Sequence, residues 1–256
     1  MDVEVFLTSA TVEDDDVKGR TVVVIDVLRA CSTIVTALAN GARAVLPVAD
    51  MAEAGRIASN LNRSVYRLGG EREGTKIDGY DLGNSPRAYT REAVEGRDVI
   101  LNTTNGTVAL TRASAAEELL VGCFLNVERV IERIEAAGRD VTIVCAGQSN
   151  RISLEDTLCA GLLLHRLWDG EEPDVTTDTA HVAFSQYRRD RDDVAQALRR
   201  SDNARRLAGL DAQEDVQYCM RVDALPLLPR FDDNRLLPVG DEQPELDTTP
   251  PAGERA

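Results

Sequence analysis

The stretch RTVVVIDVLRACSTIVTALANG, residues 20–41, decides the fold class. Residues 22–25 form an apolar, β-branched run that is typical of a buried strand. Asp26 follows this run directly, Arg29 comes three residues later, and a helical pattern over 32–39 ends at an Asn-Gly stop signal. The stretch therefore predicts a strand, a polar loop and a helix, with a carboxylate and a guanidinium where the strand ends.

Two later segments repeat this plan, and each of them again places a small polar loop between an apolar run and a helical pattern. The expected strands are Thr21–Ile25, Asp98–Leu101 and Val141–Cys145. The loops are DVLRACST, NTTNGT and AGQSNRIS, and the expected helices are 32–39, 107–116 and 153–167. Alternating strands and helices predict an α/β fold with a mostly parallel sheet covered on both faces. Ligands of such sheets bind at the carboxyl ends of the strands, where all three loops would lie.

The rest of the chain predicts further elements within one α/β domain over residues 1–239. We expect helices at 51–60, 127–137 and 191–209, a strand at 215–222 and a long glycine-rich loop at 68–86. Residues 169–178 are expected to be a solvent loop, or a joint between two related halves, and residues 240–256 a disordered acidic tail. The helices at 127–137 and 153–167 have apolar faces that could form a homodimer contact, although core packing is their expected use.

The composition of the chain argues against several classes of partner. The chain of 256 residues carries a formal net charge of −15, which argues against nucleic acid and anionic membranes as partners. No apolar run reaches the roughly 20 residues needed to span a bilayer, and we identify no secretion signal. Five scattered cysteines suit reduced thiols and a cytoplasmic protein. An anionic substrate would need local positive charge, so each arginine near a site is informative.

Carboxylates from three of these segments are candidate metal ligands. They are Asp26, then Glu71, Glu73, Asp78 and Asp81, and finally Glu155 and Asp156. Oxygen ligands from several strand-end loops, completed by water and a substrate phosphate, are typical of Mg²⁺ sites. The alternative also stays open, because Ser153 and Asp156 match a capping box and loop carboxylates are often only solvated.

Two loops could bind phosphate. The loop NTTNGT at 102–107 offers hydroxyl and backbone N–H donors around Gly106, although a plain capped turn would look the same. The sequence contains neither a P-loop nor a dinucleotide-binding glycine motif. Cys145 and Arg151 have the spacing of cysteine-dependent phosphatases, but Val144 precedes the cysteine and only Gly147 lies within the loop. A thiolate phosphatase is therefore a weaker alternative.

The segments VVVIDVLRACSTIVTAL, GGEREGTKIDGYDLGNSPRAY, LNTTNGTVAL and SLEDTLCAG together resemble the 2-phosphosulfolactate phosphatases. The resemblance runs from about Val22 to Gly161, with a weaker echo at 207–223. It implies a three-layer α/β/α fold with the site at the strand ends. It also implies Mg²⁺-dependent hydrolysis of 2-phospho-3-sulfolactate to 3-sulfolactate and phosphate, a reaction associated with coenzyme M biosynthesis.

The matching positions give a set of expected site residues. On chemical grounds we assign catalysis to Asp26, Arg29 and Asp81, and metal binding to Asp26, Glu71 and Asp156. Substrate binding is assigned to Arg72, Asn84, Ser85, Thr104 and Asn105, with Lys76 as a further cation for the substrate. Cys31 departs from the pattern, where we expect a threonine.

The nucleophile is expected to be water, with an aspartate nucleophile as the alternative. A small anionic phosphoester is the expected partner. A protein that binds such a metabolite without turnover remains the non-catalytic alternative.

Overall fold

The structure is a computed structural model that describes residues 1–239. Its centre is a ten-stranded sheet with the order β1-β8-β2-β7-β9-β10-β3-β6-β4-β5. The strands are β1 Val3–Phe6, β2 Thr21–Ile25, β3 Ala44–Val48, β4 Tyr66–Arg72, β5 Thr75–Lys76, β6 Asp98–Asn102, β7 Glu118–Gly122, β8 Val141–Cys145, β9 Pro229–Asp232 and β10 Arg235–Pro238. The three strands predicted from the repeated plan are confirmed, with β6 one residue longer than expected.

The sheet consists of two parallel blocks joined by an antiparallel hairpin. One block is β1-β8-β2-β7, and the other is β3-β6-β4. The hairpin β9–β10 pairs antiparallel with both β7 and β3, which makes the whole sheet mixed rather than purely parallel. The strands of this hairpin lie near the end of the described chain and pair with strands more than a hundred residues away. No local sequence pattern therefore predicted the hairpin.

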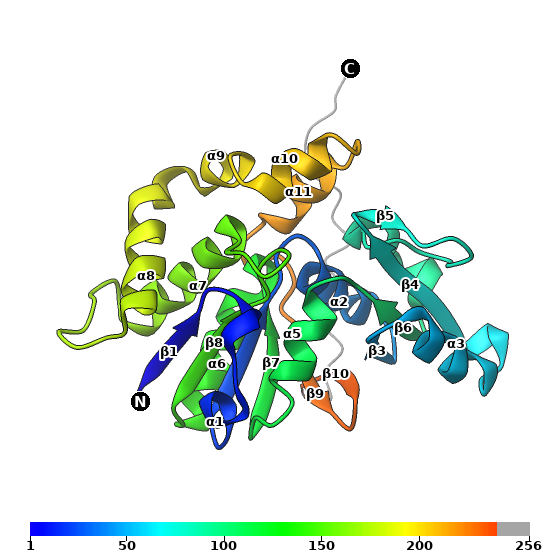
Figure 1. The fold of residues 1–256 in the computed structure, drawn as a ribbon, viewed down its shortest axis with the longest axis horizontal. Helices are drawn as coiled ribbons and strands as arrows, with labels where there is room; N and C mark the ends of the chain where they lie inside the picture. Colours follow the sequence, from blue (N-terminus) through cyan, green and yellow to red (C-terminus); the bar gives the residue numbers. More distant parts are fainter. Residues whose placement is uncertain (240–256) are drawn as a thin grey trace.

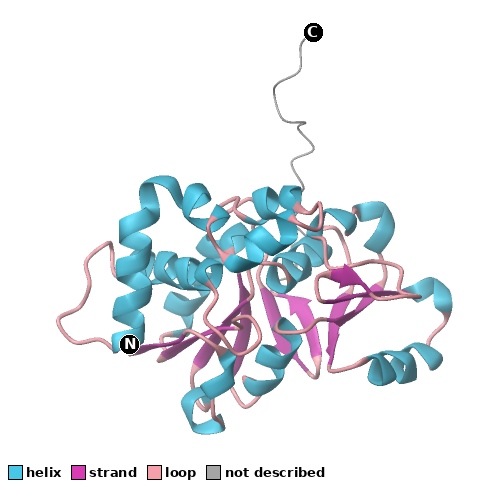
Figure 2. Cartoon of the chain, turned by 45° about the horizontal axis from the view of Figure 1, so that its top comes forward, coloured by secondary structure: helices cyan, strands magenta, loops and turns pink. Residues whose placement is uncertain are grey.

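Helices cover both faces of the sheet, which gives the expected three-layer α/β/α arrangement (Figures 1 and 2). The α-helices are α1 Asp14–Val17, α2 Ala30–Ala39, α3 Met51–Ser59, α4 Arg91–Val94, α5 Gly106–Arg112, α6 Val127–Ala137, α7 Leu154–Leu167, α8 Asp178–Asp190, α9 Val194–Arg199, α10 Asp202–Ala208 and α11 Gln213–Cys219. In Figure 1, α9, α10 and α11 lie together above the ends of the strands in the block β1-β8-β2-β7. No helix within residues 1–239 is both long and apolar enough to cross a membrane.

Strand β2 shows how the sequence builds the two main cores. Val23 and Ile25 point into the core beneath α6, α7 and α8, whereas Val22 and Val24 point into the opposite core with α2 and α5. All five residues of the strand are buried, because helices cover both faces. Each fully buried valine or isoleucine contributes about 1.5–3 kcal/mol, so this strand is anchored firmly and fixes the position of the loop that follows it.

Two predicted elements in the last third are wrong. Residues 215–222 are not a strand: Gln213–Cys219 form α11, and Val216 and Cys219, three residues apart, face inward. The alternation of Val216, Tyr218 and Met220 looked strand-like, but the helical spacing prevails. The single helix expected at 191–209 is instead broken, because Ser201 caps a new helix, α10, with its hydroxyl.

The glycine-rich segment at 68–86 is more regular than predicted. Its first part belongs to β4, which pairs with β6 and forms a tight hairpin with β5. Gly69 and Gly70 are required inside the strand, since a Cβ atom there would lie 2.2 Å from the Tyr89 hydroxyl and the Asn102 carbonyl oxygen respectively. Residues between α7 and α8 form the expected irregular connection at 169–178, and the predicted tail at 240–256 lies outside the described residues.

Candidate active site

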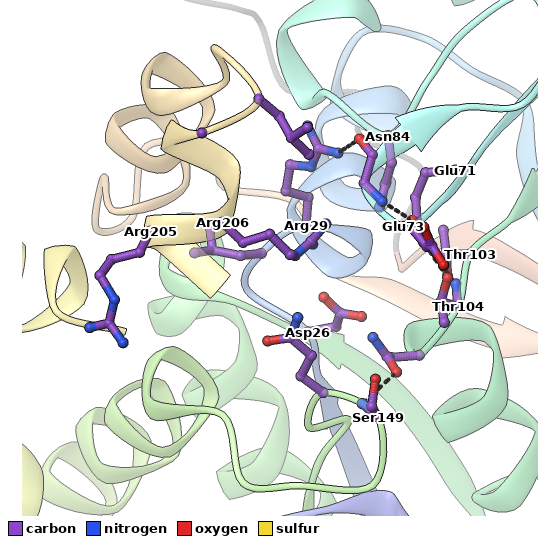
Figure 3. A pocket seen from close by; sticks show the side chains of 16 residues that line it. Asp26, Arg29, Glu71, Glu73, Asn84, Thr103, Thr104, Ser149, Arg205 and Arg206 are labelled. Atoms are coloured by element: carbon purple, nitrogen blue, oxygen red, sulfur yellow. Dashed lines mark hydrogen bonds between the residues drawn. The ribbon is translucent and has the colours of Figure 1, made fainter. Parts of the chain in front are cut away.

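A cavity of about 500 Å³ opens where the carboxyl ends of β2, β4, β6 and β8 meet the C-terminal helices (Figure 3). The ends of strands and the loops that follow them contribute Asp26, Leu28, Arg29, Glu71, Glu73, Gly74, Asn84, Thr103, Thr104, Asn105, Gln148 and Ser149. The α10 region contributes Arg205, Arg206, Gly209 and Leu210. The predicted location of the site, at strand ends, therefore coincides with this cavity.

Asp26 lies at the floor of the cavity, directly after β2, and is 7% exposed. Its Oδ1 accepts a hydrogen bond from the backbone N–H of Ala30 at 3.1 Å. Burial, together with the negative charges of Glu71 and Glu155, raises the pKa of Asp26 to about 7. Near neutral pH this carboxyl is thus poised between its two protonation states, and a bound cation would favour the ionised form.

Gly106 gives Asp26 the space it occupies. A Cβ atom at this position would lie 2.8 Å from Oδ2 of Asp26 and 2.5 Å from the Cβ of Ala30. The glycine of the NTTNGT loop is therefore needed because two loops, after β2 and after β6, approach each other closely. The sequence indicated only that Gly106 lies in a polar loop. The contact with Asp26 and Ala30, which requires a glycine there, is visible only in the structure.

Glu71 brings a second carboxylate to the cavity, at the end of β4. Its Oε2 accepts from the backbone N–H of Gly74 at 2.7 Å. Its Oε1 accepts from both the backbone N–H and the hydroxyl of Thr104, each at 2.9 Å. These bonds hold the carboxylate in one orientation and join the β4 hairpin to the β6 loop, so the two halves of this wall are fixed relative to each other.

The loop after β6 presents polar groups to the same space. Thr103 and Thr104 line the cavity, and the side-chain oxygen of Asn105 accepts from the backbone N–H of Ser149 at 3.2 Å. Across from them Asn84 is buried, and its side-chain oxygen has no hydrogen-bond partner within residues 1–239. Such a group is satisfied when a ligand supplies a donor.

Arg29 is the buried cation of the site. Its Nη1 donates to Oδ2 of Asp215 at 2.7 Å, and its Nη2 donates to the carbonyl oxygen of Gly74 at 2.9 Å. The hydroxyl of Ser85 donates to the other oxygen of Asp215 at 2.6 Å. Asp215, on α11, therefore fixes Arg29 with a buried ion pair, and Ser85 fixes Asp215 rather than lining the cavity.

With this geometry in view, comparison with known proteins identifies the family. A family model described as 2-phosphosulpholactate phosphatase matches residues 6–234. The chain belongs to this family.

Relatives named probable 2-phosphosulfolactate phosphatase match over nearly the whole chain. The relative from Caldanaerobacter subterraneus subsp. tengcongensis is 38% identical over 234 residues, covering 90% of this chain and 95% of the relative. The relative from Clostridium acetobutylicum is 35% identical, covering 93% and 100%, and that from Symbiobacterium thermophilum is 38% identical, covering 87% and 96%. The family predicted from the sequence is confirmed, and its name belongs to the predicted enzyme class, the phosphoric monoester hydrolases.

Asp156 does not reach the cavity of this family member. Its Oδ1 accepts from the backbone N–H of Val27 at 2.9 Å and its Oδ2 from that of Gly147 at 3.2 Å. Burial, and then the charges of Asp26 and Glu155, raise its pKa well above the usual range. Asp156 thus ties the loop after β2 to the loop after β8, and its neighbour Glu155 faces an adjoining cavity of about 600 Å³.

Other predicted residues also lie elsewhere. Asp81 pairs with Arg63 and accepts from the backbone N–H of Leu68 at 2.8 Å, so its carboxylate braces β4 from outside the cavity. Arg72 and Lys76 are exposed on the β4–β5 hairpin and do not line the cavity. The structure therefore gathers Asp26, Arg29, Glu71, Asn84, Thr104 and Asn105 around one space.

The thiolate alternative finds no geometric support. Cys145 is fully buried and packs in the core formed with Val23 and Ile143, not in the cavity. Burial raises the pKa of its thiol well above the usual range, so the group stays protonated. Cys31 is likewise buried, and its sulfur accepts from the backbone N–H of Asp26 at 3.1 Å, so this departure from the family pattern packs beneath Asp26 rather than facing the cavity.

The donor set at the cavity fits a magnesium ion with few protein ligands. Within residues 1–239, no three His, Cys, Asp or Glu side chains converge as a complete metal site. Mg²⁺ needs no such group, since one or two carboxylates commonly hold it together with water and substrate phosphate. Asp26 and Glu71 line the same cavity and interact electrostatically, so these two residues are the ones that could hold it.

Several cavity residues escaped prediction. Arg206, which lines the cavity, and Asp215, which holds Arg29, come from short helices without any local motif. The only available signal was the Arg-Arg pair at 205–206 in a chain of strongly negative charge. Gly74 was missed because its role depends on its carbonyl group, which accepts from Arg29.

Proposed function

We propose that this chain is a Mg²⁺-dependent phosphatase that hydrolyses 2-phospho-3-sulfolactate to 3-sulfolactate and inorganic phosphate. The substrate class comes from the names of the family and of the relatives. The observation that carries the proposal is that two carboxylates, Asp26 and Glu71, and the guanidinium of Arg29 line one cavity. A dianionic phosphoryl group needs more than one cation, and such a cavity offers a carboxylate pair for a metal ion together with a guanidinium.

The chain's own groups would bind and orient the phosphoryl group. Arg29 keeps N–H groups beyond those used by Asp215 and Gly74, and these can bind phosphoryl oxygens. Thr103 and Asn105 line the same cavity, where their hydroxyl and side-chain amide can donate to equatorial oxygens as negative charge spreads over them, while Thr104 uses its hydroxyl and backbone N–H to hold Glu71. Positioning and charge stabilisation of this kind supply most of the catalysis in phosphoryl transfer.

Asp26 and Glu71 would hold the metal ion, which would polarise the phosphoryl group and the attacking water. The hydrogen bonds to Glu71 from Gly74 and Thr104 prevent its carboxylate from swinging away. We favour water as the nucleophile over Asp26 itself. Acid quench of a reaction with phosphorus-labelled substrate would then leave no label on the protein, whereas a phosphoaspartate would retain it.

Phosphate release from 2-phosphosulfolactate, with Mg²⁺ and with EDTA, tests the proposal. We expect turnover with Mg²⁺, loss of turnover with EDTA, and no effect of iodoacetamide, since Cys145 is buried. Inhibition by iodoacetamide but not by EDTA would instead favour the thiolate mechanism. Binding of the substrate without phosphate release would favour the non-catalytic alternative.

A further inference from the structure

Arg206 is a half-buried arginine, and only part of its guanidinium group makes hydrogen bonds within residues 1–239. It lines the 500 Å³ cavity and also the adjoining 600 Å³ cavity, so its guanidinium stands between the two. Its Nη1 is buried and has no hydrogen-bond partner in the part of the chain that the structure describes. A buried, unpaired donor on a cation is costly, and an anion bound in the cavity would remove that cost.

The rest of the guanidinium is held in place. The side-chain oxygen of Asn203 accepts from Nε of Arg206 at 3.2 Å and from its Nη2 at 2.7 Å. Asn203 is itself buried, and its Nδ2 donates to the carbonyl oxygen of Leu28 at 2.6 Å. The orientation of Arg206 is thus tied to the loop that carries Asp26 and Arg29, while its Nη1 has no hydrogen-bond partner among residues 1–239.

Arg206 and Arg29 meet at Gly74. A Cβ atom on Gly74 would lie 2.2 Å from Nη1 of Arg206, and the Gly74 carbonyl accepts from Arg29. Figure 3 shows the two side chains entering from different elements, Arg206 from α10 and Arg29 from the loop after β2. Asp215 already neutralises Arg29, but no carboxylate pairs with Arg206 within residues 1–239.

We propose that Arg206 binds the sulfonate of the substrate and so determines specificity for it. This inference rests on the proposed function, since it concerns the same cavity. The substrate carries a phosphate, a carboxylate and a sulfonate, and the sulfonate is one bond further from the phosphate-bearing carbon than the carboxylate is. We place the phosphate at the strand ends, beside Arg29, and assign the sulfonate, on the longer arm of the substrate, to Arg206 on the α10 side of the same cavity.

Comparison of two substrates in the Arg206→Gln variant tests this assignment. For 2-phosphosulfolactate we expect kcat/KM to fall about 10- to 100-fold, mainly through KM, because one charge-assisted hydrogen-bond pair is lost. For 2-phospholactate, which has the carboxylate but no sulfonate, we expect a change below about threefold. Equal losses for both substrates would overturn the assignment, because Arg206 would then bind a group that the two share.

Two further variants control for charge and folding. Arg206→Lys keeps the charge but cannot form the fork with Asn203, so its selectivity should lie between those of the wild type and Arg206→Gln. Arg199→Gln removes an exposed arginine of neighbouring α9 that lines neither cavity, and its selectivity should match the wild type. A similar loss of selectivity in Arg199→Gln would overturn the proposal in favour of a general effect of net charge.

Calorimetry separates this inference from the proposed reaction. The product 3-sulfolactate should bind the wild type more tightly than lactate does, and Arg206→Gln should lose most of that difference. If the wild type releases no phosphate but this binding difference is seen and depends on Arg206, the proposed reaction fails while the sulfonate site stands. If phosphate is released but Arg206→Gln keeps the wild-type preference for sulfolactate, the sulfonate site fails alone.

Discussion

The two walls of the cavity are built in different ways. The strand-end wall, formed by Asp26, Glu71 and the loop Thr103–Asn105, comes from segments that directly follow buried strands. The helical wall, formed by Arg206 and supported by Asn203 and Asp215, comes from two short helices that cover the strand ends (Figure 3). The first wall carries the negative charge of the site and the second carries or fixes the positive charge.

The two walls differ in what holds their side chains in position. In the strand-end wall, the sheet fixes each loop, because every residue of β2 is buried between two helical layers. In the helical wall, position depends on single long-range contacts, such as the Asn203 bond to the Leu28 carbonyl, which spans 175 residues. We therefore expect substitutions in the strand-end wall to affect chemistry most, and substitutions in the helical wall to affect both binding and the docking of α10 and α11.

The largest expected effect follows substitution of Asp26 in the strand-end wall. Asp26→Asn keeps the size of the side chain but removes a ligand charge for the metal ion. Loss of several kcal/mol of transition-state stabilisation should lower kcat/KM by about 10³-fold or more. Phosphate release at saturating Mg²⁺, with folding checked by circular dichroism, measures this effect.

Glu92→Gln is a matched control for Asp26→Asn. Glu92 is an exposed acid on α4 that lines neither cavity, so its loss changes net charge by the same amount. Its kcat/KM should stay within about twofold of the wild-type value. Near-normal turnover of Asp26→Asn with intact Mg²⁺ dependence would remove Asp26 from the mechanism.

A smaller effect is expected from Asp215, the residue that links the two walls. Asp215→Asn breaks the buried pair with Arg29 and leaves the guanidinium without a counter-charge. Breaking such a pair costs about 3–5 kcal/mol in the free energy of unfolding. We also expect a roughly 10- to 100-fold loss in kcat/KM, because Arg29 is no longer held toward the phosphate.

Urea unfolding and steady-state kinetics measure the two effects separately. Glu214→Gln is the matched control, since Glu214 precedes Asp215 on α11 but pairs with Arg87 at the surface. That variant should lose at most about 1 kcal/mol and little activity. A stable Asp215→Asn variant with normal kinetics would show that Arg29 needs no support from the helical wall.

The strand-end wall was largely predictable from the sequence, and the helical wall was not. Asp26 and the NTTNGT loop follow apolar runs that can hardly be anything other than strands, so their common location follows from the rules for parallel sheets. Asp215 was instead assigned to a strand, and Arg206 to a single long helix that is in fact broken. Their roles depend on which face of a short helix meets the cavity, and tertiary packing alone decides that.

The same limit applies to the carboxylates. Residue type and spacing placed Asp26, Asp81 and Asp156 at equal rank as oxygen donors, yet only Asp26 lines the cavity. The other two lie outside it, where the carboxylate of Asp81 accepts from Arg63 and a backbone N–H, and that of Asp156 accepts from two backbone N–H groups. Hydrogen-bond partners distant in sequence made the difference, and no local pattern encodes them.

The protonation of Asp26 gives a stability test without substrate. Its folded-state pKa is raised from 3.8 to about 7, so without metal the folded protein holds this proton more tightly than the unfolded chain. The stabilisation is fully present below pH 3.8 and is lost as the pH rises through about 7. In EDTA, Asp26→Asn should therefore become more stable than the wild type as the pH rises through this window, by up to about 4 kcal/mol.

Urea unfolding of both proteins at pH 5 and pH 8.5 measures this difference. Added Mg²⁺ should then stabilise the wild type at pH 8.5 by mass action, and it should stabilise Asp26→Asn much less. The pH dependence tests burial of the carboxyl, whereas the Mg²⁺ dependence tests its use as a ligand. Equal stabilisation of both proteins by Mg²⁺ would place the metal ion elsewhere.

The smallest effect is expected for substitution of Asp81. This variant tests whether the catalytic role assigned from the sequence or the position in the structure describes Asp81 correctly. The sequence led us to assign Asp81 to catalysis on chemical grounds, whereas its carboxylate contacts Arg63 and the backbone of Leu68 outside the cavity. Asp81→Asn keeps an oxygen for the Leu68 N–H and loses only a partly exposed ion pair. The variant should lose about 1 kcal/mol or less in unfolding free energy, with kcat/KM within about threefold of wild type. A loss approaching that of Asp26→Asn would mean that the loop after β5 moves Asp81 into the cavity when substrate binds, so the strand-end wall would be less rigid than its buried strands imply.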